Sequence, residues 1–114
     1  MLVVEDEAAV AFMLEEMLEE LGCEVAASVA TVARAEAAMG SVAVDVALLD
    51  VNLAGETTIG FAQGLVRQAI PFVFSTGYGG GGLPPDLQDR PVLTKPFGPA
   101  DLRRAIELVL PAAA

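Results

Sequence analysis

The sequence contains no histidine and a single cysteine, and both features limit the chemistry of the chain. Without histidine, it lacks the usual general base and the usual zinc ligand, and it cannot itself carry phosphohistidine. Cys23 has no partner for an internal disulfide, and we interpret it as a buried apolar residue rather than a redox centre. Any catalytic chemistry must therefore come from other side chains.

Basic residues and long apolar runs are also scarce. Six basic residues stand against sixteen acidic ones, so the net charge is −10. An acidic surface repels phosphate backbones, and we expect no direct nucleic-acid binding. The longest uncharged stretch, residues 68–85, contains five glycines and three prolines, whereas a membrane span needs about 20 mostly apolar residues. No basic segment follows Met1, so we expect no signal peptide, no membrane contact and a cytoplasmic location.

The length of 114 residues suits a single domain, which we place at residues 1–114. Short apolar runs alternate with amphipathic helical patterns, which indicates a parallel sheet covered on both faces. We therefore predict an α/β, flavodoxin-like doubly wound fold with a five-stranded sheet in the order 2-1-3-4-5. The predicted strands are residues 2–4, 24–28, 44–49, 71–75 and 92–94, and the predicted helices are residues 10–21, 31–39, 59–67 and 102–109, the last with Pro99 in its first turn.

The connection between the fourth and fifth strands departs from this alternation. Residues 77–89 contain four consecutive glycines and the pair Pro84–Pro85. Glycine and proline both disfavour a regular helix. We therefore predict that the fourth helix is shortened or absent and that a loop takes its place.

Polar side chains lie at the ends of four of the five predicted strands: Glu5 and Asp6, then Asp50, then Ser75 and Thr76, then Lys95. Ligand sites of doubly wound sheets lie beyond the carboxyl ends of the strands, so we expect these groups to meet. Two carboxylates about 5 Å apart repel each other by roughly 3 kcal/mol at an effective dielectric of about 20. A divalent cation relieves this repulsion, and oxygen ligands favour magnesium or calcium over zinc. A cation, a lysine and a hydroxyl around one aspartate suit phosphoryl transfer to that aspartate.

Each of these groups also has a simpler structural explanation. Glu5 and Asp6 could be solvated residues at the start of the first helix, and Asp6 could cap it. Asp50 could be a loop cap. Thr76 could lie in a turn, and Lys95 could be an ordinary surface residue. Their joint placement at four strand ends favours a common site, because unrelated loops would scatter such groups.

Four segments together resemble the signatures of response-regulator receiver domains, with matching order and spacing over the whole chain. These segments are Leu-Val-Val-Glu-Asp-Glu at 2–7, Leu-Leu-Asp-Val-Asn-Leu at 48–53, Ser-Thr-Gly at 75–77 and Thr-Lys-Pro-Phe at 94–97. The resemblance implies a phosphoacceptor domain of a two-component phosphorelay, with magnesium as its cofactor. Its partners would be a histidine kinase or a histidine phosphotransfer protein, and a downstream protein target.

The resemblance also implies a role for each site residue. Asp50 would be the phosphoacceptor, and Asp6 and Asp50 would bind magnesium directly. Glu5 would bind the ion through water, and Asn52 through its main-chain carbonyl. Thr76 would bond the phosphoryl group, Lys95 would pair with it, and Pro96 would follow a cis peptide bond.

Residues 71–78 are similar to the Pro-Phe-x-Phe-Ala-Thr-Gly motif of an atypical receiver group, with Ser75 in place of the alanine. That group occurs mainly in alphaproteobacteria and often works with HWE or related histidine kinases. Receivers often place an aromatic switch residue three positions before the lysine, where Val92 stands here. We therefore expect the switch region, Thr76, Tyr78 and Val92, to act by closure of the 77–89 loop rather than by rotation of a ring.

Two other functions remain open at this point. The fold could serve as an interaction module that works without phosphorylation, although Asp50, Thr76 and Lys95 count against this. It could also be a magnesium-dependent hydrolase similar to haloacid dehalogenases, although Asn52 stands where such an enzyme needs a second acid. As a receiver, the chain would be no enzyme beyond self-phosphorylation and slow autodephosphorylation. It could stand alone or belong to a longer protein such as a hybrid kinase.

Overall fold

The computed structural model describes residues 1–53, 55–77 and 83–109. Five parallel strands form the central sheet in the order β2-β1-β3-β6-β7. Counted along the chain, these are the first to fifth strands of the sheet, so the predicted order 2-1-3-4-5 and the flavodoxin-like fold are confirmed. The strands are β1 Leu2–Val4, β2 Ala27–Val29, β3 Ala47–Asp50, β6 Phe72–Thr76 and β7 Val92–Thr94.

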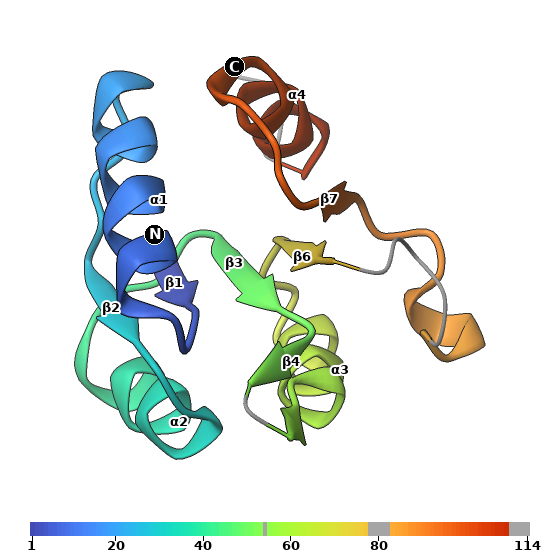
Figure 1. Cartoon of the computed structure of the whole chain (residues 1–114). Helices are drawn as coiled ribbons and strands as arrows, with labels where there is room; N and C mark the ends of the chain where they lie inside the picture. The colour runs from blue at the N-terminus through green and yellow to red at the C-terminus, as the bar shows by residue number, and fades with distance from the viewer. Residues whose placement is uncertain (54, 78–82, 110–114) are drawn as a thin grey trace.

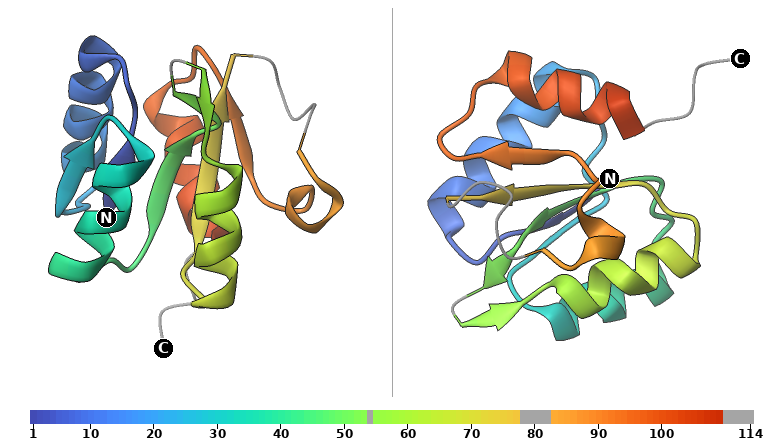
Figure 2. Two further views of the ribbon diagram at one scale, coloured as in Figure 1. Left: turned by 90° about the horizontal axis from the view of Figure 1, so that it is seen from below. Right: turned by 90° about the vertical axis from the view of Figure 1, so that its right-hand side faces the viewer.

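Helices cover both faces of this sheet, because its strands are apolar on both sides. The helices are α1 Ala8–Glu20, α2 Val32–Ser41, α3 Ile59–Arg67 and α4 Pro99–Val109. Along β1, Leu2 and Val4 face the core under α2 and α3, whereas Val3 faces the core under α1 and α4. Figures 1 and 2 show the same pairing, with α1 and α4 on one side and α2 and α3 on the other. Within the described ranges, none of these helices has both the length and the apolar composition needed to cross a bilayer.

A single short turn occupies the described part of the connection between β6 and β7. It is the 3-10 helix η1, Pro85–Leu87, and Leu87 is fully buried with Leu83 in the core under α2 and α3. The predicted loss of a regular fourth helix thus agrees with the described residues of this connection. Tyr78 and the four glycines that follow it, residues 78–82 of the predicted switch loop, lie outside the described residues.

Several predicted boundaries were wrong by a few residues. The second and third strands start three residues later than predicted, at Ala27 and Ala47, because each pairs with β1 and β1 starts at Leu2. The second helix continues through Gly40, since one glycine in a helix costs only about 1 kcal/mol. A hairpin of β4 Asn52–Leu53 and β5 Glu56–Thr57 was not predicted. Gly55 lies in its turn with φ +91°, a backbone conformation that favours glycine.

Ala69, just after α3, has φ 58°, in the left-handed region. Its amide donates to Val66 O, and the next amide, of Ile70, donates to Leu65 O, so the helix end fixes this conformation. A β-carbon in this conformation destabilises the folded state by about 1–2 kcal/mol. A glycine avoids that cost, but it makes the unfolded chain more flexible, which lowers the free energy of unfolding by about 0.4–1 kcal/mol.

Ala69→Gly is therefore expected to raise the free energy of unfolding by about 0.5–1 kcal/mol, measured by urea titration. The control is Ala37→Gly on the exposed side of α2, which should lower it by about 0.5–1 kcal/mol. A loss of stability in both variants would contradict the assignment of strain to Ala69.

Candidate functional site

The predicted polar residues, apart from the buried Ser75, meet at the carboxyl edge of the sheet. Glu5 and Asp6 follow β1, Asp50 is the last residue of β3, Thr76 is the last residue of β6, and Lys95 follows β7. An open cavity of about 460 Å³ lies there, lined by Asp6, Glu7, Asp50, Asn52, Gly55, Thr76, Gly77 and Lys95. Five predicted site residues thus line one cavity, although they come from four separate stretches of the chain.

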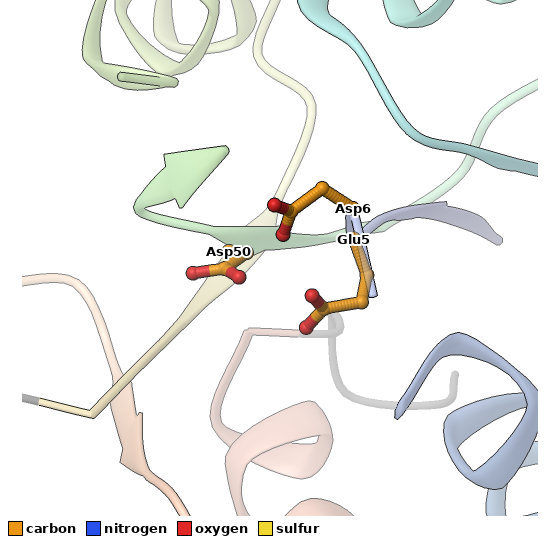
Figure 3. Close-up of side chains that lie close together, drawn as sticks. All are labelled: Glu5, Asp6 and Asp50. Carbon is orange, nitrogen blue, oxygen red and sulfur yellow. The ribbon is translucent and has the colours of Figure 1, made fainter. Parts of the chain in front are cut away.

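Three carboxylates lie close together at this edge of the sheet, as Figure 3 shows. One oxygen from each of Glu5, Asp6 and Asp50 lies within 4.8 Å of the others. Glu5 is 3% exposed and Asp50 is 7% exposed, so water screens their repulsion only weakly. The interpretation of Asp6 as a helix cap is wrong, because Glu7 occupies the N-cap position of α1.

Lys95, the only lysine in the sequence, bridges two of these acids. Its Nζ donates to Glu5 Oε1 at 2.8 Å and to Asp50 Oδ2 at 3.1 Å. Its main-chain amide donates to Thr76 O at 2.8 Å, which ties the residue to the end of β6. The Lys95–Pro96 peptide bond is cis. The contact between Lys95 and Glu5 was not predicted, since the resemblance to receiver domains implies only that the lysine pairs with the phosphoryl group.

Burial and hydrogen bonding shift the pKa of both partners. Burial raises the pKa of Glu5 above its usual value, and the hydrogen bonds from Lys95 and from the Glu7 amide offset only part of that effect. For Lys95, burial alone would lower the pKa, but the hydrogen bonds to Glu5 and Asp50 outweigh it and the pKa is raised. Lys95 therefore carries its charge at neutral pH and places a cation beside Asp50.

Main-chain and side-chain donors fix the segment that carries Asp50. The amide of Asn52 donates to Asp50 Oδ1 at 3.3 Å, and the amide of Val51 donates to Ser75 O at 3.0 Å. The hydroxyl of Thr58 donates to Asp50 O at 2.8 Å. Sequence reasoning missed Thr58, although a pair of threonines just before a helical pattern is a helix-start signal that draws attention to the position.

The three predicted switch residues have different positions. Thr76 is 6% exposed and lines the cavity. Val92 is half-buried in β7, where it pairs with Phe74 and packs against the core under α2 and α3. Tyr78 lies outside the described residues.

Comparison with known proteins identifies the family. The sequence model of the family described as response regulator receiver domain matches residues 1–107. The chain belongs to this family. Receiver domains are typically phosphoacceptors in two-component signalling, and they interact with histidine kinases and downstream targets. They are generally non-enzymatic signalling modules and typically bind Mg²⁺ at an acidic cluster.

Solved structures similar to this receiver domain include atypical alphaproteobacterial receivers. SdrG from Sphingomonas melonis Fr1 is 42% identical, with a TM-score of 0.82, 93% of this chain covered and 91% of that chain. The BeF3-activated conformation of SdrG, from Pseudomonas melonis Fr1, is 40% identical with a TM-score of 0.79 and the same coverage. The response regulator PhyR from Brucella abortus is 31% identical with a TM-score of 0.79, and the match covers 96% of this chain but 46% of that one. No curated protein matches the chain.

Proposed function

We propose that this receiver domain takes a phosphoryl group on Asp50 from a histidine kinase or a histidine phosphotransfer protein, with the help of Mg²⁺. The observation that carries the proposal is the position of the Asp50 carboxylate, which lines an open cavity between an acid pair and the charged Lys95. The cavity leaves room for a phosphoryl donor, and the lysine offsets the negative charge that would otherwise repel it.

The residues around Asp50 fit a magnesium ion. All three carboxylates are hard oxygen donors, as Mg²⁺ prefers, and their oxygens are close enough to share one ion. We assign direct ligation to Asp6 and Asp50, and to Asn52 through its main-chain carbonyl. The two oxygens of Glu5 already accept hydrogen bonds from Lys95 Nζ and from the Glu7 amide, which supports a contact through water for Glu5.

The proposed reaction is a displacement at phosphorus. A carboxylate oxygen of Asp50 forms the new P–O bond while the bond to the donor's imidazole nitrogen breaks, and the imidazole keeps the electron pair. Magnesium, when bound, supplies positive charge to the phosphoryl oxygens. Lys95 can exchange its contact with Asp50 Oδ2 for a phosphoryl oxygen while it keeps Glu5. The hydroxyl of Thr76 then bonds the transferred group.

We also propose that residues 1–114 act as one cytoplasmic receiver domain. Thr76, Tyr78 and Val92 belong to the region of this domain that changes on phosphorylation. The downstream target of the domain is a protein, and the only chemistry of the domain is self-phosphorylation and slow loss of the phosphoryl group.

Incubation with labelled acetyl phosphate and magnesium tests this function. We expect one phosphoryl group per chain, removable by hydroxylamine, and no label when a chelator is present. A chain that takes no label would instead be an interaction module that works without phosphorylation. Repeated turnover on diverse phosphate esters would support the hydrolase alternative.

Magnesium is also expected to stabilise the fold, because it binds the folded site and offsets the repulsion between Asp6 and Asp50. At a Mg²⁺ concentration ten times the dissociation constant, the free energy of unfolding rises by about 1.4 kcal/mol. This corresponds to a rise in Tm of about 6 °C for a domain of this size. Asp6→Ala should remove this rise. Asp45→Ala, which removes an exposed carboxylate elsewhere, should retain it. Thermal unfolding of chelator-treated protein measures both, and an unchanged wild-type Tm would contradict the site.

A further inference from the structure

Thr58 occupies the N-cap position of α3 and is fully buried, at 0% exposure. A threonine at this position usually accepts a hydrogen bond from an amide in the first turn of its own helix. Within the described part of the chain, its side chain makes no such bond. The hydroxyl instead donates to Asp50 O at 2.8 Å, with a longer contact of 3.4 Å to Val51 O.

The backbone of Thr58 holds the same segment. Its amide donates to Val51 O at 3.0 Å. Thr58 therefore donates to the main-chain carbonyl groups of two consecutive residues, Asp50 and Val51. On the other side, the amide of Val51 donates to Ser75 O on β6. The peptide units that join Asp50 to Asn52 are therefore held from both sides, between α3 and the sheet.

This segment carries two of the groups assigned to the metal, the carboxylate of Asp50 and the main-chain carbonyl of Asn52. Their relative position depends on the orientation of the intervening peptide units. The Asn52 amide already donates to Asp50 Oδ1, which shows that the segment folds back on the carboxylate. Because a buried carbonyl group needs a hydrogen-bond donor, loss of the Thr58 hydroxyl would let the peptide after Asp50 reorient.

We propose that Thr58 is a positioning residue for the metal site: its hydroxyl orients the peptide after Asp50 so that the Asp50 carboxylate and the Asn52 carbonyl converge on one Mg²⁺ ion. The inference rests on the proposed function, since it concerns the same site. Thr58 acts through the Asp50 main chain, and its side chain is fully buried.

The test compares Thr58→Val, which keeps the shape but removes the hydroxyl, with Thr58→Ser, which keeps the hydroxyl. Thr57→Val at the exposed neighbouring position is the matched control. Calorimetric Mg²⁺ titration of each folded variant is expected to show a dissociation constant about tenfold larger for Thr58→Val than for the wild type. This is the effect usual for residues that orient metal ligands. Thr58→Ser and Thr57→Val should stay within about twofold of the wild type.

A purely structural role predicts a different result. Thr58→Val would then unfold at lower urea concentration without metal, but the folded variant would bind Mg²⁺ as the wild type does, and that outcome overturns the inference while the proposed function stands. Weakened binding in Thr58→Ser as well would assign the effect to the methyl group and also overturn it. If Thr58→Val does not fold, Thr58→Ala is titrated under the same criterion. A wild type that binds no Mg²⁺ would reject the proposed function, and this inference with it.

Discussion

Asp50→Asn should take up no phosphoryl group from acetyl phosphate, a reduction of about 100-fold or more in labelling, while the domain stays folded. The amide that replaces the carboxylate has almost the same shape but is a poor nucleophile at phosphorus. The Asn52 amide can still donate to the side-chain oxygen, and Lys95 keeps its contact with Glu5. The fold therefore loses little, and removal of one buried negative charge even reduces the repulsion at the site.

Mass spectrometry of the intact chain after treatment with acetyl phosphate and magnesium measures this effect. The matched control is Asp45→Asn, an exposed aspartate just before β3, which should accept the phosphoryl group as the wild type does. Wild-type labelling of Asp50→Asn would reject Asp50 as the acceptor. A circular dichroism spectrum equal to that of the wild type separates loss of chemistry from loss of fold.

The sequence alone predicted the sheet order and the edge at which the site lies, because apolar runs and helical periods are local patterns. The starts of two strands were not predictable in this way. Val25 is apolar and packs into the core under α1 and α4, but β2 pairs with β1 only from Ala27. A strand begins where its partner begins, and that depends on a segment distant in the sequence.

The site shows the same limit. Its carboxylates and Lys95 were identified because each directly follows an apolar strand. The contact between Lys95 and Glu5 joins residues 90 positions apart, and it depends on strand order and side-chain length together. Thr58 was missed because a threonine before a helix predicts a cap, whereas here its hydroxyl donates to the strand that carries Asp50. Local patterns thus place the reactive groups, but the hydrogen bonds that orient them need the tertiary structure.

The ammonium group of Lys95 lies between Glu5 and Asp50, so it has two opposing effects on the proposed reaction. It offsets the negative charge of the incoming phosphoryl group, which favours transfer to Asp50. It also competes with a metal ion for the same negative charge, because two cations near one carboxylate repel each other. Its removal should therefore change phosphorylation and metal binding in opposite directions.

Lys95→Met keeps most of the length of the side chain and removes its charge. We expect phosphorylation by acetyl phosphate to slow by about 100-fold, the usual effect of losing one group that stabilises transition-state charge. We expect Mg²⁺ to bind at least as tightly as in the wild type. Rates of labelling and calorimetric titration measure the two effects, and Arg103→Met on the exposed side of α4 is the control for the change in net charge. A general folding defect would weaken both together, so a parallel loss of metal binding and phosphorylation would contradict this role for Lys95.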